Sequence, residues 1–147
     1  MKTILLIMIG LSSLSVAQES PRFTKENGVV TDSKTTLKWQ DDYSDNGDSI
    51  KSAKWTDAID YCEGLSLNGQ SDWRLPNKKE LLSIVDYDRY NPNISPVFQK
   101  TTSNVYWSST TSLIVTNSAY LVNFSYGGVG SYRKSQSFYV RCVRAGQ

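Results

Sequence analysis

The sequence predicts an α+β fold in which two helices pack on a largely antiparallel sheet. Strand-like segments lie near both ends of the chain, at residues 29–39 and 105–143, and two helix-like segments lie between them. Because strands and helices are grouped rather than alternating, this order favours an antiparallel sheet. Plentiful tyrosine and tryptophan, with only 2 methionines among 147 residues, are typical of a β-rich domain rather than a helical bundle.

The first strands are expected at residues 29–31 and 37–39. The Asn27-Gly28 step before them is a strong turn signal. The first helix is expected over residues 55–65, because apolar side chains recur there at the three- and four-residue spacings of one helix face. These are Trp55, Ala58, Ile59, Cys62 and Leu65.

A second helix is expected to begin after Asn77 and to end near Asp88. Pro76 disfavours a helical conformation just before it, and Asn77 with Glu80 matches a capping box. Residues 87–102, which contain two prolines, are expected to be irregular. Further strands are expected at residues 105–111, 119–126 and 137–143, with the glycine- and serine-rich segment 126–137 as a long connection.

Residues 1–17 resemble a signal peptide. They contain Lys2, an apolar run over residues 4–14 and a small-residue end at Ala17. The run is shorter than the roughly 20 apolar residues that cross a bilayer. We expect export through the Sec route to the periplasm or the cell exterior, as a single domain of residues 18–147 that is not an integral membrane protein. A retained anchor or a buried strand is the alternative.

The chain has two cysteines, Cys62 and Cys142, and no histidine. In an exported chain two cysteines predict one disulfide, and two separately buried thiols are the alternative. The absence of histidine excludes imidazole-based acid–base catalysis. The net charge of +2 gives no overall reason to expect nucleic acid or an anionic membrane as the partner.

Five segments in this order resemble one bacterial family, the Lcl C-terminal domain, a domain of unknown function named after a collagen-like adhesin. They are GVVTD at 28–32 with LKWQ at 37–40, WTDA at 55–58 with YC at 61–62, WRLPNKKEL at 73–81, YWSST at 106–110 and VRCVR at 140–144. The similarity extends over about residues 22–144. The third and fourth segments are quite specific when they occur together.

The resemblance implies a C-type-lectin-like fold, related to the sulfatase-modifying and formylglycine-generating group, in which the chain ends meet in a sheet. It also implies a family turn of Thr-Gly-Leu, where this chain has Thr35-Thr36-Leu37. In the adhesin the domain is associated with binding sulfated glycans. The formylglycine-generating relatives work through reactive cysteines and copper. The two cysteines of this chain are at disulfide-like positions and do not support that mechanism.

The acidic loop of residues 41–48 is the one candidate metal site, and calcium is the only candidate cofactor. Four residues match positions one, three, five and six of an EF-hand loop: Asp42, Ser44, Asn46 and Gly47. The twelfth position, which needs a bidentate acid, is Ala53. A looser calcium site built from Asp41, Asp42, Asp45 and Asp48 is the remaining possibility, and a solvated acidic loop is the alternative.

Two polar, aromatic loops are the candidate ligand-binding surfaces, because binding residues concentrate on loops held by a rigid scaffold. One contains Tyr87, Tyr90 and Asn91, and the other contains Tyr126, Tyr132, Arg133 and Lys134. Aromatic faces stack on sugars or protein side chains, and the basic pair suits a sulfate or carboxylate; ordinary exposed loop residues are the alternative. Arg74 is expected to pair with Glu80, and Arg141 with a carboxylate or a buried carbonyl, as parts of the scaffold.

These observations favour an exported, non-catalytic binding or adhesion module that recognises a glycan or an envelope protein through its loops. The alternative is a structural or assembly component of the bacterial envelope. An enzyme of the sulfatase-modifying type is the third hypothesis, and two free, reactive thiols would distinguish it from the other two.

Overall fold

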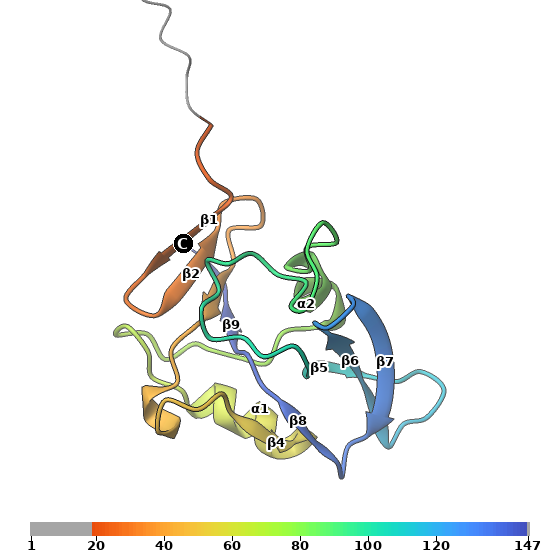
Figure 1. The fold of residues 1–147 in the computed structure, drawn as a ribbon. Helices are drawn as coiled ribbons and strands as arrows, with labels where there is room; N and C mark the ends of the chain where they lie inside the picture. Colours follow the sequence, from red (N-terminus) through yellow and green to blue (C-terminus); the bar gives the residue numbers. More distant parts are fainter. Residues whose placement is uncertain (1–18, 147) are drawn as a thin grey trace, which may run out of the picture.

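The computed structural model describes residues 19–146. The predicted signal peptide, residues 1–17, lies outside the described residues. Within them the chain forms two β-sheets and two α-helices (Figure 1). The α+β class, the two helices and the mostly antiparallel pairing are confirmed, while the C-type-lectin-like fold stays a prediction.

The first sheet joins strands from near both ends of the described residues, as the family resemblance implies. Its strands, in spatial order, are β1 (Phe23–Glu26), β2 (Val29–Asp32), β3 (Lys38–Gln40) and β9 (Val143–Arg144), and all pairs are antiparallel. Asn27 and Gly28 join β1 to β2 with φ values of 47° and 75°. Two left-handed residues in succession form the two-residue turn of a type I′ hairpin, so the predicted turn is confirmed.

The second sheet has five strands. In spatial order they are β4 (Ser52–Lys54), β8 (Ser137–Tyr139), β5 (Val105–Thr111), β6 (Ser118–Asn123) and β7 (Gly128–Arg133). Only the contact of β5 with β8 is parallel. A short 3-10 helix, η1 (Ser44–Asn46), precedes β4.

Two strand predictions were wrong. Residues 126–137 are not a long connection, because β7 pairs with the whole length of β6. Three glycines in this segment weaken the strand pattern of the sequence, and the pairing with β6 forms the strand. Residues 137–143 are not one strand, because β8 belongs to the second sheet and β9 to the first. The backbone between them bonds elsewhere, with the Val140 amide donating to Lys51 and the Cys142 carbonyl accepting from Gln40.

The helices follow their local signals at the start but not always at the end. Helix α1 (Trp55–Gly64) occupies the predicted segment. Helix α2 (Lys78–Ser83) begins with the predicted capping box, in which Asn77 accepts from the Glu80 amide and Glu80 accepts from the Asn77 amide. It ends five residues before Asp88, because the following backbone bonds to a loop: the Asp86 amide donates to Asn93.

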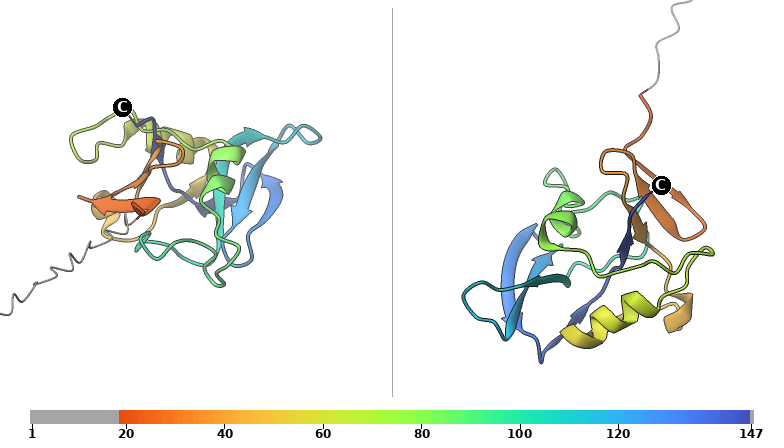
Figure 2. Two further views of the ribbon diagram at one scale, coloured as in Figure 1. Left: turned by 90° about the horizontal axis from the view of Figure 1, so that it is seen from above. Right: turned by 180° about the vertical axis from the view of Figure 1, so that it is seen from behind.

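The core has two parts. One lies under α1 and contains the two cysteines with Trp73 and Trp107. The other lies between α2 and the strands of both sheets and contains Trp39 and Tyr106. Figure 2 shows the helices on different sides of the strands, so each helix covers its own part of the core. None of the helices within residues 19–146 has the length and apolar character that a membrane crossing requires.

Candidate functional site

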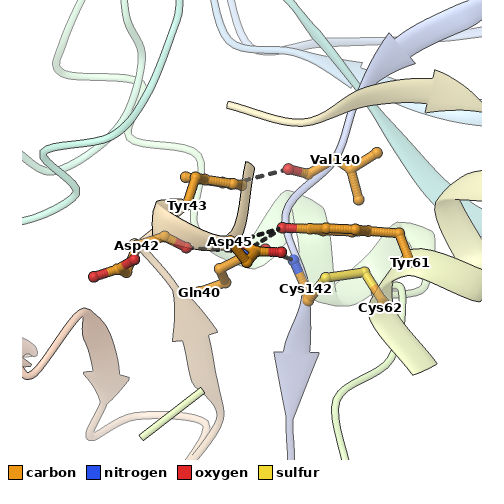
Figure 3. Close-up of a disulfide and its surroundings, with 8 residues drawn as sticks. All are labelled: Gln40, Asp42, Tyr43, Asp45, Tyr61, Cys62, Val140 and Cys142. Carbon is orange, nitrogen blue, oxygen red and sulfur yellow. Dashed lines mark hydrogen bonds between the residues drawn. A yellow bond between two sulfur atoms is a disulfide. The ribbon is translucent and has the colours of Figure 1, made fainter. Parts of the chain in front are cut away.

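The predicted disulfide is present and buried. Cys62 on α1 is bonded to Cys142, which lies between β8 and β9, and their Cα atoms are 5.4 Å apart (Figure 3). Both cysteines of the sequence are used in this bond. The bond therefore joins a helix to the segment that passes between the two sheets.

Polar side chains around the disulfide are bonded to one another (Figure 3). The Gln40 amide nitrogen donates to the Tyr61 hydroxyl at 2.8 Å, and its oxygen accepts from the Cys142 amide at 3.2 Å. The buried Tyr43 hydroxyl donates to the Val140 carbonyl at 2.9 Å. Burial raises the pKa of Tyr43 and of Tyr61. This region is a scaffold whose groups are already occupied.

The acidic loop does not gather its carboxylates into a metal site. Asp41 is buried and turns inward, where it accepts from Lys25 at 2.6 Å and from Arg141 at 3.3 Å. Asp42 instead accepts from the Ser44 amide, a bond that holds the pKa of Asp42 below its usual range. Asp45 meets a tyrosine hydroxyl, and Asp48 is exposed. Within residues 19–146 no three acidic or sulfur side chains lie close enough to hold a metal ion.

The two scaffold predictions for arginine are confirmed. Arg141 is buried and reaches both a carboxylate, Asp41, and a main-chain carbonyl, that of Lys100. Arg74 forms two bonds of 2.7 Å to the carboxylate of Glu80. The guanidinium thereby holds the Glu80 side chain where it caps α2.

The structure separates the predicted ligand-binding residues into two groups. Tyr87 donates to the Gly127 carbonyl at 3.3 Å, so Tyr126 lies at the same end of the molecule as Tyr87, Tyr90 and Asn91. The other three, Tyr132, Arg133 and Lys134, lie at the far end of β7. A six-residue strand is about 20 Å long, so no small ligand contacts both groups.

Two residues of the first group, Tyr87 and Tyr90, border two adjoining hollows on the surface, which together we call the 84–98 cleft. Their volumes are about 550 and 340 Å³. Both are lined by Asp88, Arg89 and Ser95; Tyr87 lines the larger hollow and Tyr90 the smaller. These tyrosines are 70% and 82% exposed. Large aromatic side chains this accessible, beside a concave surface, define a candidate binding site.

Both guanidinium groups at the cleft are paired with carboxylates. Arg22 forms two bonds to Asp32, at 2.9 and 2.8 Å, and Arg89 contacts Asp86 at 3.0 Å. Burial raises the pKa of Asp32, but the bonds from Arg22 and from neighbouring donors outweigh it and keep the pKa low. With Asp88 also present, the cleft offers sugar-like ligands both donors and acceptors but no uncompensated cation.

Sequence reasoning missed two features. Arg22 and Phe23 form one wall of the larger hollow, and nothing local in the sequence pairs them with residues 84–97. The aliphatic run Leu113-Ile114-Val115 is exposed at the β5–β6 turn. The sequence contained a signal for this exposed run, since three aliphatic residues in succession lie between two predicted strands.

The fold and the cleft define a small, disulfide-bonded α+β domain with an open surface site. The model of the Lcl C-terminal domain family matches residues 28–144, and the chain therefore belongs to that family. No curated protein matches the sequence.

Proposed function

We propose that this domain is an exported, non-catalytic binding module that recognises a neutral glycan at the 84–98 cleft. The observation that carries the proposal is the pair of exposed tyrosines, Tyr87 and Tyr90, at two adjoining hollows. Aromatic rings offer an apolar face to the C–H groups of a sugar. Asp86, Asp88 and Arg89 supply carboxylate and guanidinium groups for its hydroxyls.

A neutral rather than a sulfated glycan fits the charge of this site. Both guanidinium groups at the cleft already hold a carboxylate, Arg22 with Asp32 and Arg89 with Asp86. A sulfated polymer would have to displace those partners and approach Asp88 as well. Uncharged hydroxyls can instead bond to the same groups without separating the ion pairs.

A glycan array that includes neutral and sulfated members tests the proposal. We expect neutral glycans to bind the wild type and the Tyr90→Ala variant to bind them about fivefold more weakly, since an aromatic contact contributes about 1 kcal/mol. Tyr132→Ala, which removes an exposed tyrosine at the other end of the molecule, is the matched control and should bind normally.

Two results would contradict this site. Binding to sulfated glycans alone, lost on Arg133→Ala with Lys134→Ala, would move recognition to the other end of β7. Equal binding by Tyr90→Ala and the wild type would show that Tyr90 does not take part in recognition.

The proposed absence of catalysis rests on the disulfide, because a sulfatase-modifying mechanism needs reactive thiols. Titration of the denatured, unreduced protein should detect no thiol. Two titratable thiols in the secreted form would revive the enzymatic alternative.

Export is supported by the same bond, since disulfides persist in oxidising compartments. We expect the cell-derived protein to begin at Gln18 and to fractionate with the periplasm or the culture medium. N-terminal sequencing of that fraction checks this. A chain that still begins at Met1 in the cytoplasm would contradict it.

A further inference from the structure

The β5–β6 turn exposes an apolar tip, formed by Leu113, Ile114 and Val115. Leu113 is 90% exposed and Ile114 is 89% exposed. The turn projects beyond the rest of the second sheet in Figure 1 and again in both views of Figure 2. Exposing aliphatic side chains to water costs free energy in proportion to their apolar area. A contiguous pair at a projecting turn therefore indicates a surface that contacts a partner molecule or a membrane.

The tip is held in one conformation by hydrogen bonds at its base. The Ser112 amide donates to Ser118 at 2.9 Å, and the Ser118 amide donates to Val115 at 2.9 Å. The Ser112 hydroxyl accepts from the amides of Ile114 and Val115, both at 3.3 Å. The aliphatic side chains are thus presented by a bonded turn rather than by a loose loop, and little conformational entropy remains to be lost on contact.

Basic side chains stand beside this turn. The Lys134 amide donates to Asn117 at 2.9 Å, and its ammonium group bonds Thr111 at 2.9 Å. That ammonium also lies 3.9 Å from the centre of the Trp55 ring. Arg133 is opposite Ser118 in the β6–β7 pairing. Neither Arg133 nor Lys134 forms an ion pair with any residue in the described range 19–146.

The near-neutral net charge conceals a segregation of charge along the chain. All 14 acidic residues lie between Glu19 and Asp88, and every charged side chain in residues 89–147 is basic. Strands β5, β6, β7 and β8 therefore carry no carboxylate side chain. The strands at the end of the second sheet that bears the apolar tip therefore present basic and no acidic side chains, which the overall charge of the chain did not indicate; the exposed Asp57 lies in the first turn of α1, two residues after Trp55.

We propose that the apolar tip inserts into the interface of an anionic lipid bilayer, with Arg133 and Lys134 contacting headgroup phosphates. Aliphatic side chains with flanking Lys, Arg, Trp and Tyr are the composition that binds membrane interfaces. Trp55 and the half-exposed Tyr132 supply the aromatic part. The tip is convex, and a bilayer accepts a projecting apolar group without a preformed pocket, whereas a protein partner needs a matching hollow.

Co-sedimentation with vesicles tests this proposal. The probes are vesicles of phosphatidylcholine alone and of phosphatidylcholine with phosphatidylglycerol, using residues 18–147 with the disulfide intact. We expect binding to the anionic vesicles that weakens as salt rises. Leu113→Ser with Ile114→Ser should reduce the partition coefficient at least tenfold, and Arg133→Ala with Lys134→Ala should reduce it about thirtyfold on anionic vesicles only.

The matched control is Tyr90→Ala, which alters the 84–98 cleft and should leave vesicle binding unchanged. Circular dichroism of each variant checks the fold; Leu113, Ile114 and Arg133 are exposed, whereas Lys134 is half-buried and bonded to Thr111. No binding of the wild type to anionic vesicles overturns the proposal, as does unchanged binding of the tip variant. Loss of an envelope protein from pull-downs of the tip variant, without vesicle binding by the wild type, would assign the tip to a protein partner instead. A failed glycan array would not affect any of these results.

Discussion

Tyrosines serve opposite purposes in two regions of this molecule. Around the disulfide, Tyr43 is buried and Tyr61 half-buried, and each hydroxyl has a hydrogen-bond partner within the fold. At the 84–98 cleft, Tyr87 and Tyr90 present most of their surface to solvent. The first pair joins elements that are distant in the sequence, whereas the second pair adds little to the core.

In this small domain, one region provides a rigid scaffold and another provides a surface that a ligand can reach. Buried polar groups must find partners, because an unsatisfied one costs about 1 to 3 kcal/mol, so the disulfide region is fixed by its own bonds. The cleft residues have no such requirement and remain accessible to a ligand. Stability and binding should therefore respond to different substitutions.

The largest effect should come from removing the disulfide. Cys62→Ser with Cys142→Ser opens a loop of 80 residues. The free energy of unfolding should fall by about 4 to 5 kcal/mol, because the intact disulfide restricts the conformations of the unfolded chain. Denaturant titration measures this. Tyr90→Ala, at the other region, should change it by less than about 0.5 kcal/mol; a comparable loss there would erase the distinction between the regions.

The next largest effect should come from the buried carboxylate. Asp41→Ala leaves the buried Arg141 without its charge partner and removes the acceptor of the Gln99 and Lys100 amides. We expect a loss of about 3 to 5 kcal/mol. The neighbour Asp42, which only accepts within its own turn, is the matched control, and Asp42→Ala should cost about 1 kcal/mol. Equal losses would show that the buried ion pair is not what stabilises this loop.

A smaller effect should follow from the buried hydroxyl of Tyr43. Tyr43→Phe leaves the Val140 carbonyl without its donor and should cost about 1 kcal/mol. Burial raises the pKa of Tyr43, so its contribution is fully present below the unfolded pKa of about 10 and is lost as pH rises above it. The variant should therefore lose less stability than the wild type between pH 9 and 11, as measured by urea unfolding. Parallel curves would contradict this.

The smallest effect should be a gain. Thr36 has a φ of 61°, a left-handed conformation that disfavours β-branched residues, at the position where the family resemblance implies glycine. Thr36→Gly should stabilise the domain by about 0.5 to 1 kcal/mol, as measured by thermal melting. Thr35→Gly is the control and should destabilise, because the Thr35 hydroxyl donates to Asp32 at 2.8 Å. A loss at both positions would mean that the Thr36 side chain contributes more than its strain.

Much of the fold was predictable because its signals are local. The apolar spacing of α1, the capping box of Asn77 and Glu80 and the Asn27-Gly28 turn each depend on residues within one or two turns of chain. The end of α2 and strand β7 were not predictable in this way. The first depends on Asn93, and the second on the edge of β6, and neither partner is marked by the pattern of the segment itself.

The candidate site divides in the same way. The sequence by itself determined the disulfide, the family and the aromatic residues of the loops, since composition and short motifs carry them. Only the tertiary structure decided that Tyr126 lies with Tyr87 while Tyr132 lies at the other end of β7, that Asp41 turns inward to Arg141, and that residues 113–115 stay exposed. Each of these depends on contacts between distant segments, which the packing of two sheets fixes and no local spacing encodes.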